Sequence, residues 1–234
     1  MLFDALTRVV SPYQSNPLNY NPLRQVLESS IDFAELRRRS AVKLFLSATN
    51  VRTGKVRVFG SGEISADAVL ASACLPFLYQ AVEIDGEHYW DGGYMGNPAV
   101  FPLIYECSCT DVVVVHINPI NRPDLPTTAT EIMNRINEIS FNSSLMREMR
   151  AISFVNTLIE NGTLSGIEMK RMRMHAIDAE AVMQKLGVSS KLNADLDFLL
   201  HLHAIGRARA EAWLAGDFAE VGQRSTVDLQ DRYL

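Results

Sequence analysis

Short apolar runs in the first half of the chain predict β-strands. Residues 42–48 (V-K-L-F-L-S-A) and the run V-V-V-V-H-I-N that follows Asp111 are mostly apolar and are bounded by polar turns. Such runs are typical of strands that are covered on both faces, as in a parallel sheet. Residues 82–84 and 87–90 flank an Asp-Gly pair, which favours the tight turn of a β-hairpin.

Apolar residues at helical spacing predict helices between and after these strands. Ser65 is placed to cap a helix over 66–74. Thr128 and Glu131 form a capping box for a long helical region. The remaining expected elements are a strand over 170–177, helices near 178–186 and 194–215, and a loosely held tail from residue 223. Strands that alternate with helices predict an α/β protein, here with a helical C-terminal portion.

Composition and charge narrow the classes of protein and partner. Of 234 residues 47% are hydrophobic, and the net charge of −5 argues against a nucleic-acid partner. No stretch approaches the about 18 consecutive apolar residues that span a bilayer, and residues 1–8 lack the layout of a signal peptide. The three cysteines cannot all pair, which favours reduced thiols and a cytoplasmic location.

Asp91 is the carboxylate best placed for catalysis. It follows Tyr89-Trp90 at the end of the predicted hairpin and leads into Gly92-Gly93, where backbone or substrate can approach closely. The alternative is that this Asp-Gly-Gly sequence is only a turn. A nucleophile is harder to find: no G-x-S-x-G elbow occurs in the chain, and Ser61, which lies between glycines, lacks the required spacing.

Motifs for cofactors and metals are also lacking in the sequence. There is no P-loop and no G-x-G-x-x-G, so no nucleotide or other cofactor is expected. Cys107 and Cys109 have no further His or Cys at ligand spacing, so no metal is expected. A weaker alternative is a metal-dependent hydrolase that uses Asp91 and His116, although a hydrogen-bonded core residue is the simpler interpretation of His116.

Four short motifs follow one another in a fixed order. They are 71–76 (A-S-A-C-L-P), 82–86 (V-E-I-D-G), 89–93 (Y-W-D-G-G) and Asn97-Pro98. Their order and spacing, together with the run 42–48, resemble the second half of the patatin-like phospholipases. The resemblance covers about residues 11–120, and residues 121–234 look like the helical extension of some bacterial members.

The resemblance implies a fold and a division of the chain. The fold is a three-layer α/β/α arrangement with a mainly parallel sheet. Residues 1–120 would be the C-terminal portion of the catalytic domain, and 121–234 a mainly helical extension packed on it, with one further strand near 170–177. The family's first strands would be missing from beside 42–48, which leaves an apolar sheet edge unpaired.

The resemblance also implies roles for three residues. In this family a Ser on a G-x-S-x-G elbow attacks an ester carbonyl, and the Asp of a D-G-[GA] motif is its general base, with no His between them. A glycine-rich loop donates N–H groups to the oxyanion. Asp91 is therefore the expected general base, and Gly92 and Gly93 complete its motif. The Ser and the oxyanion loop have no counterpart in this chain.

The expected function follows from this incomplete set of catalytic groups. We expect a lipid acyl hydrolase that acts on phospholipid or other acyl esters, in which this chain carries Asp91 but not the nucleophile. Without the Ser the chain alone should be inactive, since loss of a nucleophile costs of order 10⁶ in rate. The missing N-terminal half would come from the same reading frame or from a separate chain. The alternative is a non-catalytic remnant that binds lipid or a partner. Membrane contact is expected to be transient and interfacial.

Overall fold

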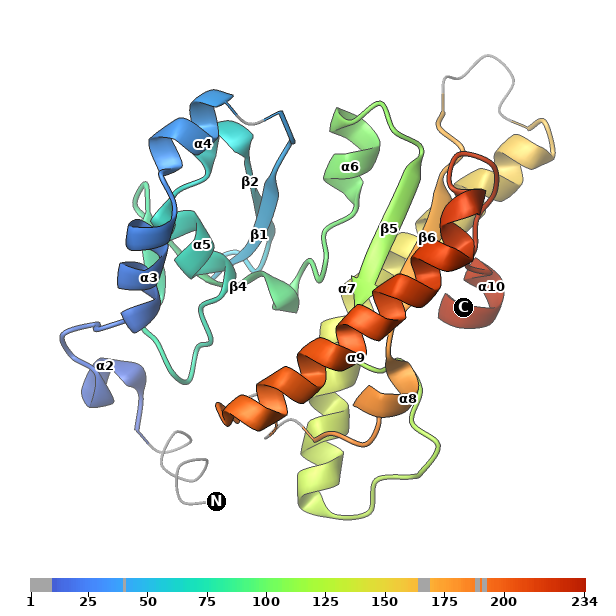
Figure 1. The fold of residues 1–234 in the computed structure, drawn as a ribbon. Coiled ribbons are helices and arrows are strands. Elements are labelled where there is room, and N and C mark those ends of the chain that lie inside the picture. The colour runs from blue at the N-terminus through green and yellow to red at the C-terminus, as the bar shows by residue number, and fades with distance from the viewer. Residues whose placement is uncertain (1–9, 40, 164–168, 188–189, 191–192) are drawn as a thin grey trace. The chain divides into compact units, whose positions relative to one another are not determined.

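The computed structural model describes residues 10–234 except 40, 164–168, 188–189 and 191–192 (Figure 1). The opening segment 1–8, which lacks the layout of a signal peptide, lies outside the described residues. The chain divides into two compact units, Met1–Pro102 (unit 1) and Leu103–Leu234 (unit 2). The division into family domains at residue 120 stays a prediction, because compactness alone does not test it.

Unit 1 consists of short helices and one small sheet. Its helices are α2 (Pro12–Ser15), α3 (Pro22–Ser30), α4 (Phe33–Arg39) and α5 (Ala66–Ser72), with 3₁₀ turns η1 (Ser61–Glu63) and η2 (Gly92–Tyr94). Its strands are β1 (Phe45–Asn50), β2 (Val56–Gly60), β3 (Val82–Ile84) and β4 (Glu87–Asp91). The sheet order is β2-β1-β4-β3, and every neighbouring pair is antiparallel. The prediction of a mixed α/β fold is confirmed.

Residues 42–48 were expected in a parallel sheet, beside an edge left unpaired by missing strands. The missing strands stay a prediction, but the expected strand direction is wrong: β1 pairs antiparallel with β2 over Phe45–Thr49 and with β4 over Ala48–Asn50. The physical reason is loop length: residues 51–55 join β1 to β2, whereas a parallel connection needs a dozen or more residues. The three-layer arrangement stays a prediction.

Small residues let helix α5 pack closely on the sheet of unit 1. The Ser65 hydroxyl oxygen accepts a hydrogen bond from the Ala68 N–H (3.1 Å), which confirms the predicted N-cap. Ala68 is buried in a core with Ala48, Phe59 and Tyr89. Helix α5 contacts β1, β3 and β4, and α3 lies against α5 on the side away from β1 (Figure 1). The core of unit 1 therefore lies on one face of the sheet.

The hairpin that leads to Asp91 forms as predicted. Its turn residues Asp85 and Gly86 have φ angles of +54° and +78°, and a two-residue turn with two positive φ angles matches the twist of the flanking strands. Strands β3 and β4 pair in the register Val82↔Tyr89. Asp91 is the last residue of β4.

Unit 2 combines a parallel strand pair with helices. Its elements are α6 (Phe101–Glu106, which begins at the end of unit 1), β5 (Asp111–His116), α7 (Ala129–Glu160), β6 (Arg173–Asp178), α8 (Glu180–Met183), α9 (Leu196–Ala215), η4 (Asp217–Glu220) and α10 (Leu229–Tyr233). Strands β5 and β6 are parallel, as predicted for the run after Asp111. Val113 and Val115 are nevertheless exposed, so β5 is not covered on both faces as expected.

The long helices of unit 2 follow the sequence signals. Helix α7 begins after the predicted capping box, in which Glu131 N–H donates to Thr128 Oγ1 (3.3 Å) and Thr128 N–H donates to Glu131 Oε2 (3.0 Å). Helix α9 lies against β6, and α10 against α7 (Figure 1). Among the helices that the structure describes, none is both long and apolar enough to cross a membrane.

The C-terminal tail is held firmly, which corrects the prediction of a loose tail from residue 223. The N–H groups of Thr226 and Val227 both donate to the Met174 carbonyl of β6 (3.2 Å each). Tyr233 is 2% exposed, and the guanidinium of its neighbour Arg232 pairs with Asp178 at 2.8 Å. The tail looked loose because most of its residues are polar, and its few anchors bind positions far away in the sequence.

Asp111 links the start of β5 to this tail. Its carboxylate accepts a hydrogen bond from the Gly222 N–H (2.8 Å), lies 3.2 Å from the buried His175 ring, and pairs with Arg173 at 3.2 Å. Burial acts to raise the pKa of Asp111, but the hydrogen bonds from Gly222 and His175 and the charge of Arg173 together hold it below its usual value. Ionised Asp111 therefore stabilises unit 2.

Candidate functional site

The backbone of Asp91 is fixed on both sides by hydrogen bonds. Asp91 lies opposite Ala48 in the β1–β4 register. Its N–H donates to the carbonyl of Cys74, just after α5, at 2.8 Å. Its own carbonyl accepts a hydrogen bond from the Thr49 hydroxyl, also at 2.8 Å. Asp91 thus joins the end of β4 to helix α5 and to strand β1.

The carboxylate of Asp91 begins the glycine turn that the sequence singled out. Oδ1 accepts a hydrogen bond from the Gly93 N–H at 2.7 Å, so that Asp91 is the N-cap of η2. The N–H groups of Met95 and Gly96 both donate to the carbonyl of Gly92, at 3.0 and 2.8 Å. The turn therefore closes on itself directly after the carboxylate.

Gly92 is required by its distance from strand β1. A Cβ atom added at Gly92 would lie 2.1 Å from the Ser47 carbonyl oxygen and 2.5 Å from Ser47 Oγ, well inside any contact that a real Cβ makes. Gly92 and Gly93 are both buried. At Gly92 the Asp-Gly-Gly sequence is therefore fixed by close backbone packing as well as by turn conformation.

Two neutral polar side chains lie within electrostatic range of Asp91. The Cys74 thiol is 1% exposed, and its pKa is raised to about 11, first by burial and also by the negative charge of Asp91. Burial, and then the charges of Asp91 and Cys74, raise the pKa of Tyr94. Both groups are protonated at neutral pH, so the side chains that respond to the charge of Asp91 are a neutral thiol and a neutral phenol.

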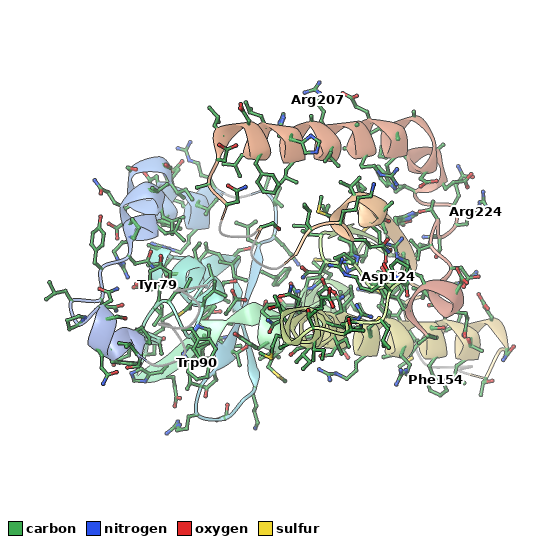
Figure 2. The ribbon with its side chains drawn as sticks, turned by 90° about the horizontal axis from the view of Figure 1, so that it is seen from below. Tyr79, Trp90, Asp124, Phe154, Arg207 and Arg224 are labelled. Atoms are coloured by element: carbon green, nitrogen blue, oxygen red, sulfur yellow. The ribbon has the colours of Figure 1, made fainter. Side chains whose placement is uncertain are left out.

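A cavity of about 380 Å³ in unit 1 does not include Asp91. Its walls include Tyr13, Arg52, His88 and Trp90. Because successive side chains of a strand point to opposite faces, Trp90 and Asp91 face apart. This cavity is therefore separate from the Asp91 turn. Trp90 is labelled in Figure 2 among the side chains of unit 1, and Asp124 and Phe154 are labelled among those of unit 2.

The apolar segment after α5 does not line this cavity either. By sequence, Leu75, Phe77, Leu78 and Tyr79 are candidates to line an acyl groove, although a plain core role is the simpler interpretation of most of them. Phe77 is 65% exposed, and none of the four lines the cavity. Tyr79 is labelled in Figure 2. A role of this segment in acyl binding stays a prediction.

The other residues weighed from the sequence have different surroundings. Ser61 Oγ accepts a hydrogen bond from the Leu44 N–H at 2.8 Å, as expected of a residue that holds a turn. His116 lies in unit 2, whereas Asp91 lies in unit 1. Burial lowers the pKa of His116, and the charge of Arg232 lowers it further. Within the described residues no group of three or more His, Cys, Asp or Glu side chains is arranged to hold a metal ion.

Two hydroxyl residues of the site were missed in the sequence. Thr49 binds the Asp91 carbonyl, and Ser47 Oγ donates to the Gly96 carbonyl at 2.8 Å. They are two residues apart and so share one face of β1, while Ala48 between them is buried in the core. The available signal was this alternation of small polar and apolar residues in S-A-T, which is unusual for a strand covered on both faces.

Comparison with known proteins gives a family match, over residues of unit 1 and the start of unit 2. Residues 8–104 match the family model described as patatin-like phospholipase. The matched segment contains all four strands of unit 1 and the complete Asp91 turn. No curated protein matches the chain. Residues 8–104 are therefore similar to the patatin-like phospholipase family.

Proposed function

We propose that this protein is part of a lipid acyl hydrolase and that Asp91 is its general base. The observation that carries the proposal is the fixed carboxylate: it stands at the end of a strand, is held by the Gly93 N–H at 2.7 Å, and lies inside the family match. The substrate class is an acyl ester, such as a phospholipid. The family relationship supports hydrolysis in general, and the roles of single residues are our proposal.

The chemistry requires a carboxylate that is both oriented and partly shielded from water. Asp91 is partly buried, and its backbone is held by Cys74 and Thr49. Partial desolvation raises the basicity of a carboxylate, and a general base contributes about 10²–10⁴ in rate. In the proposed mechanism Asp91 takes the proton of a Ser hydroxyl as that oxygen attacks the ester carbonyl. The proton then passes to the leaving alcohol.

We further propose that the attacking Ser is supplied from outside these 234 residues. This rests on the sequence, which contains no G-x-S-x-G elbow, and on Ser61, whose hydroxyl is engaged with Leu44. A backbone oxyanion hole would come from the same source. The partners proposed for the chain are thus the Ser-bearing segment, an acyl-ester substrate and, transiently, a lipid surface. The free thiols support a further proposal that the protein works in the reducing cytoplasm.

Labelling of the active site tests whether the nucleophilic Ser lies outside these 234 residues. The 234-residue chain alone should take up no fluorophosphonate probe and should hydrolyse a short acyl ester no faster than background. Hydrolysis that disappears in Asp91→Ala would overturn the claim that the nucleophile lies elsewhere. A reading frame upstream of Met1 that encodes G-x-S-x-G after a glycine-rich loop would support it.

A non-catalytic, lipid- or partner-binding protein is the second candidate. Exposed apolar side chains in unit 1, including Leu18 and Phe77, favour it. Sedimentation of the chain with phosphatidylcholine vesicles, together with the absence of an upstream G-x-S-x-G sequence, would support this candidate over the hydrolase.

A further inference from the structure

The contacts between strand β1 and the Asp91 turn go beyond what stability of the sheet requires. In a regular antiparallel pair the backbone groups bind one another, and side-chain hydroxyls are not needed. Here Thr49 Oγ1 donates to the Asp91 carbonyl and Ser47 Oγ donates to the Gly96 carbonyl, each at 2.8 Å. The two hydroxyls therefore bind the residue before the glycine turn and a residue at its end.

We propose that Thr49 and Ser47 are positioning residues for the Asp91 carboxylate, an inference that rests on the proposed function. Both hydroxyls bind backbone carbonyls next to the carboxylate and act on Asp91 through that backbone. Thr49, which is 7% exposed, sets the backbone from which the Asp91 side chain departs. Ser47 holds Gly96 and thereby the turn whose Gly93 N–H orients Oδ1. Catalytic groups need such support, since small displacements of a base cost large factors in rate.

Close packing makes the contact between strand β1 and the Asp91 turn rigid. The Ser47 carbonyl lies so near Gly92 that no side chain fits between them. The turn thus lies directly on β1, and the two hydroxyls bind on either side of the contact. Asp91 N–H is held separately by the Cys74 carbonyl (2.8 Å), so the residue has one support from α5 and others from β1. Removing one hydroxyl should therefore loosen the turn without dissolving the sheet.

The test uses the amide of Gly93 as a reporter in the isolated chain. Its N–H binds Asp91 Oδ1, so its ¹⁵N–¹H shift should follow ionisation of that carboxylate as pH changes. In Thr49→Val, hydrogen exchange of this amide should rise about five-fold, the factor that corresponds to one net hydrogen bond. The pH-dependent shift should become smaller. Thr49→Ser should restore both, and Ser47→Ala should have an effect of the same direction.

Two controls separate positioning from general stability. Ser61→Ala removes a hydroxyl that binds Leu44 just beyond the end of the β1–β2 pair, so it should lower stability and leave the Gly93 amide unchanged. Asp91→Asn should abolish the pH-dependent shift. The proposal is overturned if Thr49→Val and Ser47→Ala leave the Gly93 amide as in wild type, or if Ser61→Ala changes it equally. If Thr49→Val fails to fold, the Gly93 amide of Ser47→Ala is compared with that of Ser61→Ala, and the proposal requires a change in Ser47→Ala only.

This experiment is independent of the proposed function. It measures the orientation of a carboxylate and requires no hydrolysis. Should Asp91 prove unnecessary for hydrolysis in a Ser-bearing protein, the hydrolase proposal fails while the Gly93 result stands. If the Gly93 amide does not respond to removal of either hydroxyl, while Asp91 is essential for hydrolysis, then the positioning proposal fails and the hydrolase proposal stands.

Discussion

Replacing Gly92 by alanine should destabilise unit 1 strongly, because the space for a methyl group is taken by backbone. The added Cβ would lie 2.1 Å from the Ser47 carbonyl oxygen and 2.6 Å from its carbonyl carbon. A side chain could rotate away, but a strand in the middle of a sheet cannot. Overpacking costs about 1–3 kcal/mol, and this contact is with backbone, so we expect a loss of about 3 kcal/mol. With a urea m-value of about 1.5–2 kcal/mol/M, the midpoint should fall by about 1.5–2 M.

Gly62→Ala is the matched control for this substitution. A Cβ at Gly62 meets no atom within 4 Å, and its backbone has no positive φ. Its effect should stay within about 0.5 kcal/mol. Urea unfolding followed by Trp90 fluorescence in a Trp213→Phe background reports on unit 1, since Trp90 is then the sole tryptophan. Equal midpoints for Gly92→Ala and Gly62→Ala would refute the close packing of the Asp91 turn on β1.

Three further predictions concern groups with defined surroundings. Cys74, whose pKa is raised to about 11, should resist iodoacetamide at pH 8 in the folded protein, whereas exposed Cys109 should react; equal rates by mass spectrometry would contradict this. Because the pKa of Asp111 is lowered on folding, its stabilisation is present above the ordinary Asp value of about 3.9 and is lost as pH falls through the lower folded value. Urea midpoints between pH 6 and 3 should therefore fall less in Asp111→Asn than in wild type, and parallel curves would count against the linkage. Tyr233→Ala should cost about 3–5 kcal/mol and exposed Phe154→Ala less than about 1, and similar thermal melts for the two would show that the tail is not anchored.

Local signals in the sequence predicted the elements around Asp91 well. The N-cap at Ser65 and the capping box at Thr128 depend on residues within one turn, and both formed. The Asp85-Gly86 turn depends on two φ angles, and the predicted hairpin formed, with the register Val82↔Tyr89. These features place Asp91 at the end of β4, so the location of the candidate base was predictable from short stretches alone.

Features that depend on distant contacts were not predictable in the same way. The apolar run 42–48 was expected to be a parallel strand, because hydrophobicity alone gives no strand direction. The short connection 51–55 indicates an antiparallel pair, since a parallel connection needs a dozen or more residues. Thr49 and Ser47 reach Asp91 and Gly96 only through the β1–β4 pairing, which no local pattern encodes. The anchored tail likewise depends on partners far away in the sequence.

The most direct test of the account is the rate of a longer protein that contains both Asp91 and an upstream G-x-S-x-G. Asp91→Asn should lower kcat/KM for an acyl ester by about 10²–10⁴ without changing the thermal melt. Asp85→Asn is the matched control, since it makes the same chemical change at a turn position where Asn is tolerated, and it should keep the wild-type rate. A wild-type rate in Asp91→Asn would contradict the assignment of Asp91 as general base.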